Sequence, residues 1–217
     1  MRESAVMSPR AFFLVFVFSL SLGLLAHVSW AGDAPPLKQR LLDMLERDQR
    51  HRNEASALED RLGHESPEVQ ALWEKQVALD RQNLSELLAI LESSGWPRRS
   101  EVGSDAAMAA FLVVQHGDLE TQKRFLPALR LRVDEGEAQA SHWALLLDRV
   151  RMREGLPQVY GSQVVWSEAD SRLQLHPVED TTRVDARRAE VGLPPLAEYL
   201  RQFGIEDVAP PGDEGTR

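Results

Sequence analysis

The side chains best suited to acid–base chemistry are a histidine and the carboxylates near it. His116 follows Gln115 at the end of an expected helix, and Asp118 lies two residues further on. His116 could act as a general base whose ring is oriented by Asp118 or Asp148. The end of a helix also favours a protonated histidine that caps the last carbonyls, so a structural role is the alternative. No HxxxH or HExxH spacing occurs, and no metal site is expected.

An arginine that could hold an anionic group follows Asp148 in another expected helix. Arg149 could grip a carboxylate or a phosphate through two N–H groups. In the structural alternative, Asp148 or Arg149 pairs with Arg188 or Asp185 from a short helix near the C-terminus. The chain contains no nucleophile motif and no glycine-rich phosphate loop, and we therefore expect no cofactor.

Two further polar groups are candidates for a binding surface. Gln158, Tyr160 and Gln163 surround Gly161 in a strand-like run, where the glycine indicates a bulge or the close approach of a neighbouring segment. These side chains either line a polar pocket or lock the run to the helices.

The second group lies in the dense charge run 46–54. Gln49 and Arg52 are three residues apart there, so both could point toward a pocket, although a solvated helix face is the simpler interpretation of the run.

Helical elements must position these side chains. Apolar residues at helical spacing predict helices over most of the chain, with Ser66 and Asp118 as N-caps and Gly95 as a C-terminal cap. The only strand signal is Val159–Trp166 and Leu173–His176 across a polar turn, which predicts one hairpin. The expected fold is mainly α, a single helical domain with one small β-hairpin in its C-terminal half. The expected helices start near residues 37, 67, 104, 119, 138, 184 and 195.

The N-terminal segment predicts export. Arg2 and Arg10 precede an apolar run, Ala11 to Ala26, that ends at Ser29-Trp30-Ala31. These are the parts of a signal peptide. As a helix the run would span about 24 Å, short of the ~30 Å hydrocarbon core, which favours a cleaved signal over a retained anchor. Translation starts at Met1 or at Met7, and both starts give the same mature protein.

Composition narrows the function classes. The chain has a net charge of −9 and no cysteine. An acidic chain is a poor partner for a phosphate backbone, so nucleic acid is excluded as a partner. The absence of cysteine excludes disulfides, thiolate metal sites and a cysteine nucleophile.

A series of short signatures spans the chain from about residue 37 to residue 199. The signatures are Asp48-Gln49 with Arg52, Gly95-Trp96-Pro97, Val102-Gly103, Gln115-His116-Gly117-Asp118, Asp148-Arg149, Gln158 with Tyr160-Gly161-Ser162-Gln163, and Val184-Asp185 with Arg187-Arg188 and Val191-Gly192-Leu193. Their order and spacing resemble the DUF6624 family, a bacterial family of unknown function. Gly117 and Ser162 are small departures from the family pattern. The resemblance implies a common fold and supplies no activity.

The sequence therefore predicts a signal peptide over residues 1–31, a helical domain over 32–208 and a disordered tail over 209–217. We expect an exported protein, periplasmic or extracellular, that binds an unknown protein or a small anionic ligand as a monomer and meets the membrane only through its signal peptide. The alternative is a hydrolase-like enzyme with His116 as general base and an arginine-lined site for an anionic substrate. The expected ligand-binding residues are Gln49, Arg52, Gln115, His116, Arg149, Tyr160, Gln163 and Arg188.

Overall fold

The structure is a computed structural model that describes residues 35–63, 65–167, 169–170 and 172–205. The predicted signal peptide and the predicted tail from residue 209 lie outside the described residues. Within the described chain the fold is mainly α, with one two-stranded hairpin in its C-terminal half, as predicted. No helix among the described residues is long and apolar enough to cross a membrane.

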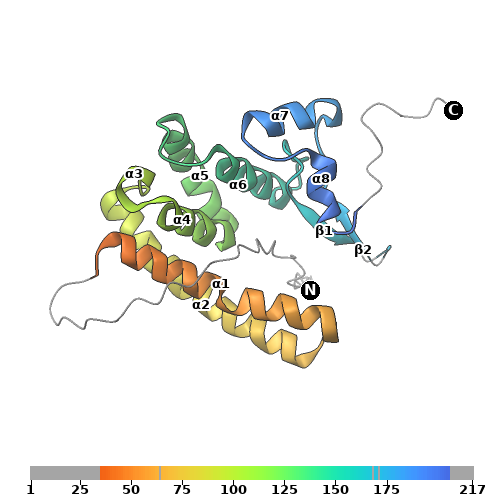
Figure 1. The fold of residues 1–217 in the computed structure, drawn as a ribbon, viewed down its shortest axis with the longest axis horizontal. Coiled ribbons are helices and arrows are strands. Elements are labelled where there is room, and N and C mark those ends of the chain that lie inside the picture. Colours follow the sequence, from red (N-terminus) through yellow and green to blue (C-terminus); the bar gives the residue numbers. More distant parts are fainter. Residues whose placement is uncertain (1–34, 64, 168, 171, 206–217) are drawn as a thin grey trace, which may run out of the picture. The chain divides into compact units, whose positions relative to one another are not determined.

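The described chain divides into two compact units, an N-terminal unit of residues 35–142 and a C-terminal unit of residues 143–205. The boundary falls within one helix, α6. The N-terminal unit is entirely helical, with α1 and α2 side by side as a long antiparallel pair (Figure 1). Its helices are α1 (Leu37–Leu62), α2 (Pro67–Ser94), α3 (Arg99–Val102), α4 (Ser104–His116), α5 (Leu119–Asp134) and the first residues of α6 (Ala140–Arg153).

Helix ends in this unit follow the predicted caps. Ser66 accepts a hydrogen bond from the N–H of Val69, and Pro67 occupies the first turn of α2. Gly95 ends α2 with a φ of 73°, in the left-handed region. Asp118 caps α5 by accepting from the N–H of Thr121. Helix α4 begins at Ser104 itself, and Gly103 is the residue before it.

Alanines let α4 pack closely against its neighbours. Ala106, Ala109 and Ala110 are buried, and the helix contacts both α1 and α2. Small side chains allow helix backbones to approach each other, so α4 brings its C-terminal residue, His116, up to the middle of α1.

Two amides of α2 bond to the backbone of α1. The side chain of Gln76 donates to the C=O of Arg47 and accepts from the N–H of His51, two groups that an uninterrupted α-helix pairs with each other. About two helical turns further along α2, the side chain of Asn83 donates to the C=O of Met44. These bonds fix the register of the two helices around the turn of α1 that carries Asp48.

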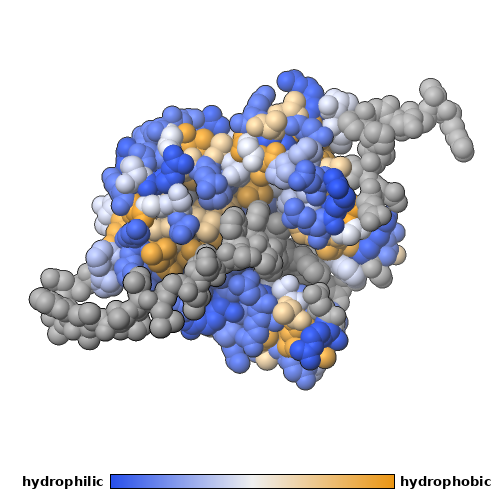
Figure 2. Space-filling model, viewed as in Figure 1, coloured by the Kyte–Doolittle hydropathy of each residue, from blue (hydrophilic) through white to orange (hydrophobic). Residues whose placement is uncertain are grey.

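The C-terminal unit combines the end of α6 with a hairpin and short helices. Strand β1 (Val164–Ser167) pairs antiparallel with β2 (Arg172–Leu175), in a register that sets Val164 opposite Leu175. A 3-10 turn, Thr181–Arg183, leads into α7 (Val184–Glu190) and α8 (Leu196–Arg201). Figure 2 shows hydrophilic residues over much of the visible face of the chain.

The hairpin is shorter than predicted. Residues 159–163 are not part of β1, because the N–H groups of Val159, Tyr160 and Ser162 bond to the carboxylate of Asp148 instead of a partner strand. In β1, Val164 is buried, whereas 37% of the surface of Trp166 is exposed.

Gly161 tests the predicted close approach. Its φ is 66°, and a β-carbon there would lie 2.9 Å from Cδ1 of Leu196. Gly161→Ala should therefore lower the melting temperature more than Gly192→Ala, since Gly192 has a similar φ of 73° but nothing within 4 Å. Thermal unfolding of both variants measures the contact separately from the backbone strain. Equal losses would show that the contact with Leu196 carries no cost.

Candidate functional site

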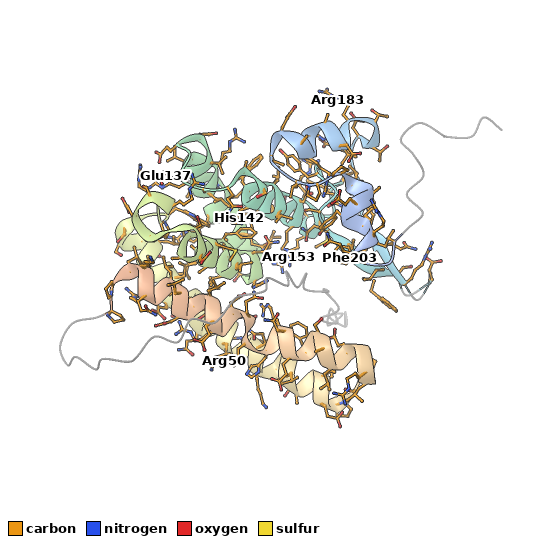
Figure 3. All side chains as sticks on the ribbon, in the orientation of Figure 1. Arg50, Glu137, His142, Arg153, Arg183 and Phe203 are labelled. Carbon is orange, nitrogen blue, oxygen red and sulfur yellow. The ribbon has the colours of Figure 1, made fainter. Side chains whose placement is uncertain are left out.

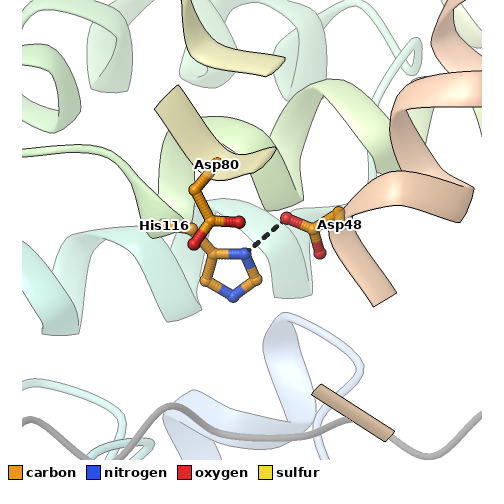
Figure 4. A group of neighbouring side chains, drawn as sticks. All are labelled: Asp48, Asp80 and His116. Carbon is orange, nitrogen blue, oxygen red and sulfur yellow. Dashed lines mark hydrogen bonds and ion pairs between the residues drawn. The ribbon is translucent and has the colours of Figure 1, made fainter. Parts of the chain in front are cut away.

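The N-terminal unit holds His116 against a carboxylate. Nδ1 of His116 lies 2.7 Å from Oδ1 of Asp48, which projects from the middle of α1 (Figure 4). The second oxygen of Asp48 accepts from the side-chain amide of Gln49, at 2.7 Å. The carboxylate that orients His116 is thus Asp48, and the prediction of Asp118 or Asp148 in this role is wrong.

An arginine and a second carboxylate complete the cluster. Nη2 of Arg52 lies 2.8 Å from Oδ2 of Asp80 and 3.9 Å from Oδ1 of Asp48. The other oxygen of Asp80 accepts from Gln76 at 2.8 Å. We call Asp48, Arg52, Asp80 and His116 the acid–base cluster. The exposed side-chain fractions are 1% for Arg52, 2% for Asp48, 3% for His116 and 15% for Asp80.

The interpretation of the charge run 46–54 as a solvated helix face is wrong for Asp48 and Arg52, which are buried. Asp48 and Arg52 are four residues apart, so both side chains lie on the same side of α1. That side faces α2 and α4, and both residues are buried. Gln49 is half-buried beside them, whereas Glu46 and Arg50 remain exposed.

The surroundings push the pKa values of the two carboxyls in opposite directions. Burial raises the pKa of Asp48, but the charge and hydrogen bond of His116, together with Arg52 and Gln49, outweigh it, and the pKa lies below its ordinary value. Burial raises the pKa of Asp80 to about 6, against the opposing effects of Arg52 and Gln76. Asp48 is therefore ionised at neutral pH, while Asp80 gains its proton only slightly below neutrality.

This geometry assigns the protons of His116. An ionised carboxylate can only accept hydrogen bonds, so Nδ1 of His116 must carry the proton that Asp48 accepts. In the neutral ring the lone pair then sits on Nε2, which points away from both carboxylates (Figure 4). Nε2 is the atom through which this cluster can take up or deliver a proton.

The cluster also meets the spacing of a metal site, since ligand atoms of Asp48, Asp80 and His116 lie within 4.8 Å of one another. The charges argue for another arrangement. The guanidinium of Arg52 already lies between the two carboxylates and compensates their charge. A cation added there would face Arg52 at close range, so the guanidinium takes the place that a metal ion would have between the carboxylates.

Asp148 in the C-terminal unit has a different role. It is buried in α6, where it accepts from the N–H groups of Val159, Tyr160 and Ser162 at 2.7 to 3.2 Å. Burial raises its pKa, and these three N–H groups oppose the rise. The predicted ion pair of Asp148 with Arg188 is not the arrangement found, since the carboxylate bonds backbone N–H groups.

Arg188 holds the same loop from its carbonyl side. Its guanidinium donates to the C=O of Tyr160 at 2.7 Å and to the C=O of Pro194 at 2.6 Å. It also lies over the ring of Tyr199, whose hydroxyl donates to the C=O of Ser162. Asp185 accepts from the N–H of Leu196 instead of pairing with Arg188.

The side chains of Gln158 and Gln163 form hydrogen bonds within their own segment, residues 158–163. The side chain of Gln158 accepts from the N–H of Gln163 and donates to its C=O. The side chain of Gln163 donates to the hydroxyl of Ser162. Arg149 is buried in α6 and Gln115 is buried in α4. Ligand binding by these residues, by Tyr160 and by Arg188 stays a prediction.

A cavity in the N-terminal unit lies away from the acid–base cluster. Its volume is about 10 Å³, room for one water molecule, and its lining includes Trp96, Met108 and His142. His142, labelled in Figure 3, stacks on Phe111 with ring centroids 4.3 Å apart. Burial lowers the pKa of His142 to about 4, so the ring is neutral and serves packing.

A family model described as "Family of unknown function (DUF6624)" matches residues 35–209. The chain belongs to this family. The predicted resemblance to the DUF6624 family is thereby confirmed. A search of curated proteins and a search of solved structures each give no match.

Sequence reasoning missed the role of Asp48 and the presence of Asp80. A usable signal existed in α2, where Gln76, Asp80 and Asn83 continue the spacing of the apolar stripe that includes Leu72 and Leu87. A polar residue at such a position must find a partner inside the protein, and this rule would have directed attention to Asp80.

Removing the charge of Asp80 should change the pH dependence of stability. The folded state raises the pKa of Asp80 from 3.8 to about 6, so its stabilising contribution is complete below pH 3.8 and is lost as the pH rises through 6. Asp80→Asn cannot ionise. The unfolding free energy of the parent, relative to this variant, should therefore fall by roughly 1–3 kcal/mol between pH 4 and pH 7. Urea unfolding at both pH values measures it, and a rise would contradict the raised pKa.

Proposed function

We propose that this protein is an exported hydrolase-type enzyme in which His116 acts as general base and Asp48 orients its ring. The observation that carries the proposal is the 2.7 Å bond between Nδ1 of His116 and Asp48, with Nε2 directed away from the carboxylates. Neighbouring carboxyls whose pKa values are shifted apart are typical of acid–base sites.

The reaction follows from these positions. Nε2 of His116 removes a proton from water, and the water oxygen bonds to the carbonyl carbon or phosphorus of the substrate. The imidazolium that forms is stabilised by ionised Asp48. The proton then passes from Nε2 to the leaving group as its bond breaks, which restores the neutral ring. A carboxylic ester or a phosphoester is the substrate class that we propose.

A second candidate is a binding protein without catalysis. It is favoured by the low exposure of the His116 side chain, 3%, because a general base needs a substrate within hydrogen-bond reach. In that case the acid–base cluster holds α1, α2 and α4 together, and the partner is an unknown protein or a small anionic ligand.

Variants of His116 and Asp48 distinguish the two candidate functions, enzyme and binding protein. With p-nitrophenyl acetate and p-nitrophenyl phosphate as probes, His116→Gln should lower hydrolysis roughly 100- to 10,000-fold, the usual contribution of a general base. Asp48→Asn should lower it comparably, because an amide favours the wrong ring tautomer. Rates are measured below the melting temperature of each variant.

Glu86→Gln provides the matched control. Glu86 is another α2 carboxylate that pairs with arginines of α1, Arg40 and Arg47, outside the acid–base cluster. This variant should hydrolyse the probes at the parent rate. Activity in His116→Gln equal to the parent, or a parent that cleaves neither probe, would sink the enzyme proposal and favour the binding protein.

Export can be tested independently of activity. The basic lead, the apolar run Ala11 to Ala26 and Ser29-Trp30-Ala31 support cleavage before Gly32. N-terminal sequencing of protein recovered from the cell envelope or medium should give a chain that begins at or near Gly32. An intact Met1 or Met7 start in a membrane pellet would contradict cleavage and indicate a retained anchor.

A further inference from the structure

One oxygen atom in the acid–base cluster lies near two donors and bonds one of them. Oδ1 of Asp48 accepts from Nδ1 of His116 at 2.7 Å, and Nη2 of Arg52 lies 3.9 Å from the same oxygen. The latter distance is too long for a hydrogen bond. A displacement of about 1 Å would bring the guanidinium into bonding range of Asp48.

Asp80 keeps Arg52 at that distance. Nη2 of Arg52 donates to Oδ2 of Asp80 at 2.8 Å, so the guanidinium is held on the α2 side of the gap between the carboxylates. Gln76 in turn holds Asp80 by donating to its other oxygen. Asp80 has the most exposed side chain of the cluster, which makes it the member that exchanges protons with solvent most readily.

Few other charges act on Asp80. Among the described residues, the titratable and charged groups that face it are Asp48 and Arg52 from α1 and His116 from α4. Its neighbour on α2, Gln76, is uncharged. Ionised Asp80 therefore competes with Asp48 for the guanidinium of Arg52.

We infer that Asp80 and Arg52 are positioning residues for His116, because ionised Asp80 draws the guanidinium away from the Asp48 oxygen that orients the imidazole ring. When Asp80 takes up a proton, its hold on Arg52 weakens and Asp48 becomes the stronger attraction. A second donor on Oδ1 then shares the charge of the carboxylate and weakens its bond to His116.

The inference concerns the site of the proposed function, and it rests on that function only for its catalytic consequence. A hydrolase built this way would lose orientation of its base as the pH falls through the pKa of Asp80, about 6. The positioning itself is a property of the folded protein and is measurable without any substrate.

Proton NMR of the His116 Nδ1–H group tests the inference. A proton in a strong bond to a carboxylate resonates at high frequency, and weakening the bond moves it to lower frequency. At pH 8, Asp80→Asn should move this resonance to lower frequency. Asp80→Glu keeps the negative charge, so its resonance should lie closer to the parent position than that of Asp80→Asn. Glu86→Gln should leave it unchanged. A resonance in Asp80→Asn that coincides with the parent, or moves to higher frequency, overturns the inference.

A second measurement needs no variant. The ¹³Cγ resonances of Asp48 and Asp80 in the parent should shift together with one midpoint near the pKa of Asp80, about 6, because the Arg52 displacement links the two carboxylates. Absence of that step at Asp48 overturns the inference. Either NMR result stands apart from the probe hydrolysis, which alone decides whether His116 is catalytic.

Discussion

The charge of Asp48, buried in the middle of α1, is the constraint on which the N-terminal unit depends. An ionised carboxylate inside a protein is tolerated only when charges and donors replace the lost water. His116 and Gln49 supply donors, and Arg52 supplies charge. Arg52 is itself buried and needs a carboxylate of its own, which α2 provides in Asp80. Asp80 then needs Gln76, and the amide of Gln76 is fixed by the backbone of α1. This series of hydrogen bonds and ion pairs begins and ends on α1. The polar side chains in it therefore have all their partners only when α1, α2 and α4 are packed together.

The C-terminal unit solves the same problem with backbone groups. Asp148 is as deeply buried as Asp48, yet its partners are three N–H groups of the loop 159–162. Backbone N–H groups are fixed in space and do not ionise near neutral pH, so this carboxylate organises a loop. The acid–base cluster instead brings together side chains that can each change protonation or position. This contrast supports the placement of chemistry at His116 and of a structural role at Asp148.

The fold class and most helix boundaries could be predicted because they depend on local signals. Ser66, Gly95 and Asp118 act within one helical turn, and their chemistry reads directly from sequence. The cluster depends on tertiary contacts. Asp48 lies in a charge-rich run that looks solvated, and only the docking of α2 and α4 onto one side of α1 buries it. The strand prediction failed at residues 159–163 for a similar reason, since a distant carboxylate captured the N–H groups that a strand would have used. His116 drew attention in the sequence because imidazole is chemically distinctive, but the carboxylate that it contacts, Asp48, lies 68 residues away in the chain.

The loop between Asp148 and Arg188 constrains the order of folding. The N–H groups of this loop bond Asp148 in α6, which is synthesised before the loop. The carbonyl of Tyr160 in the loop bonds Arg188 in α7, which is synthesised after the loop. Until α7 emerges, Asp148 can gather the N–H groups but the opposite side of the loop has no cation to bond. Such non-local contacts are costly to close and form late. The bonds on both sides of this loop therefore cannot be complete before α7, residues 184–190, has been synthesised.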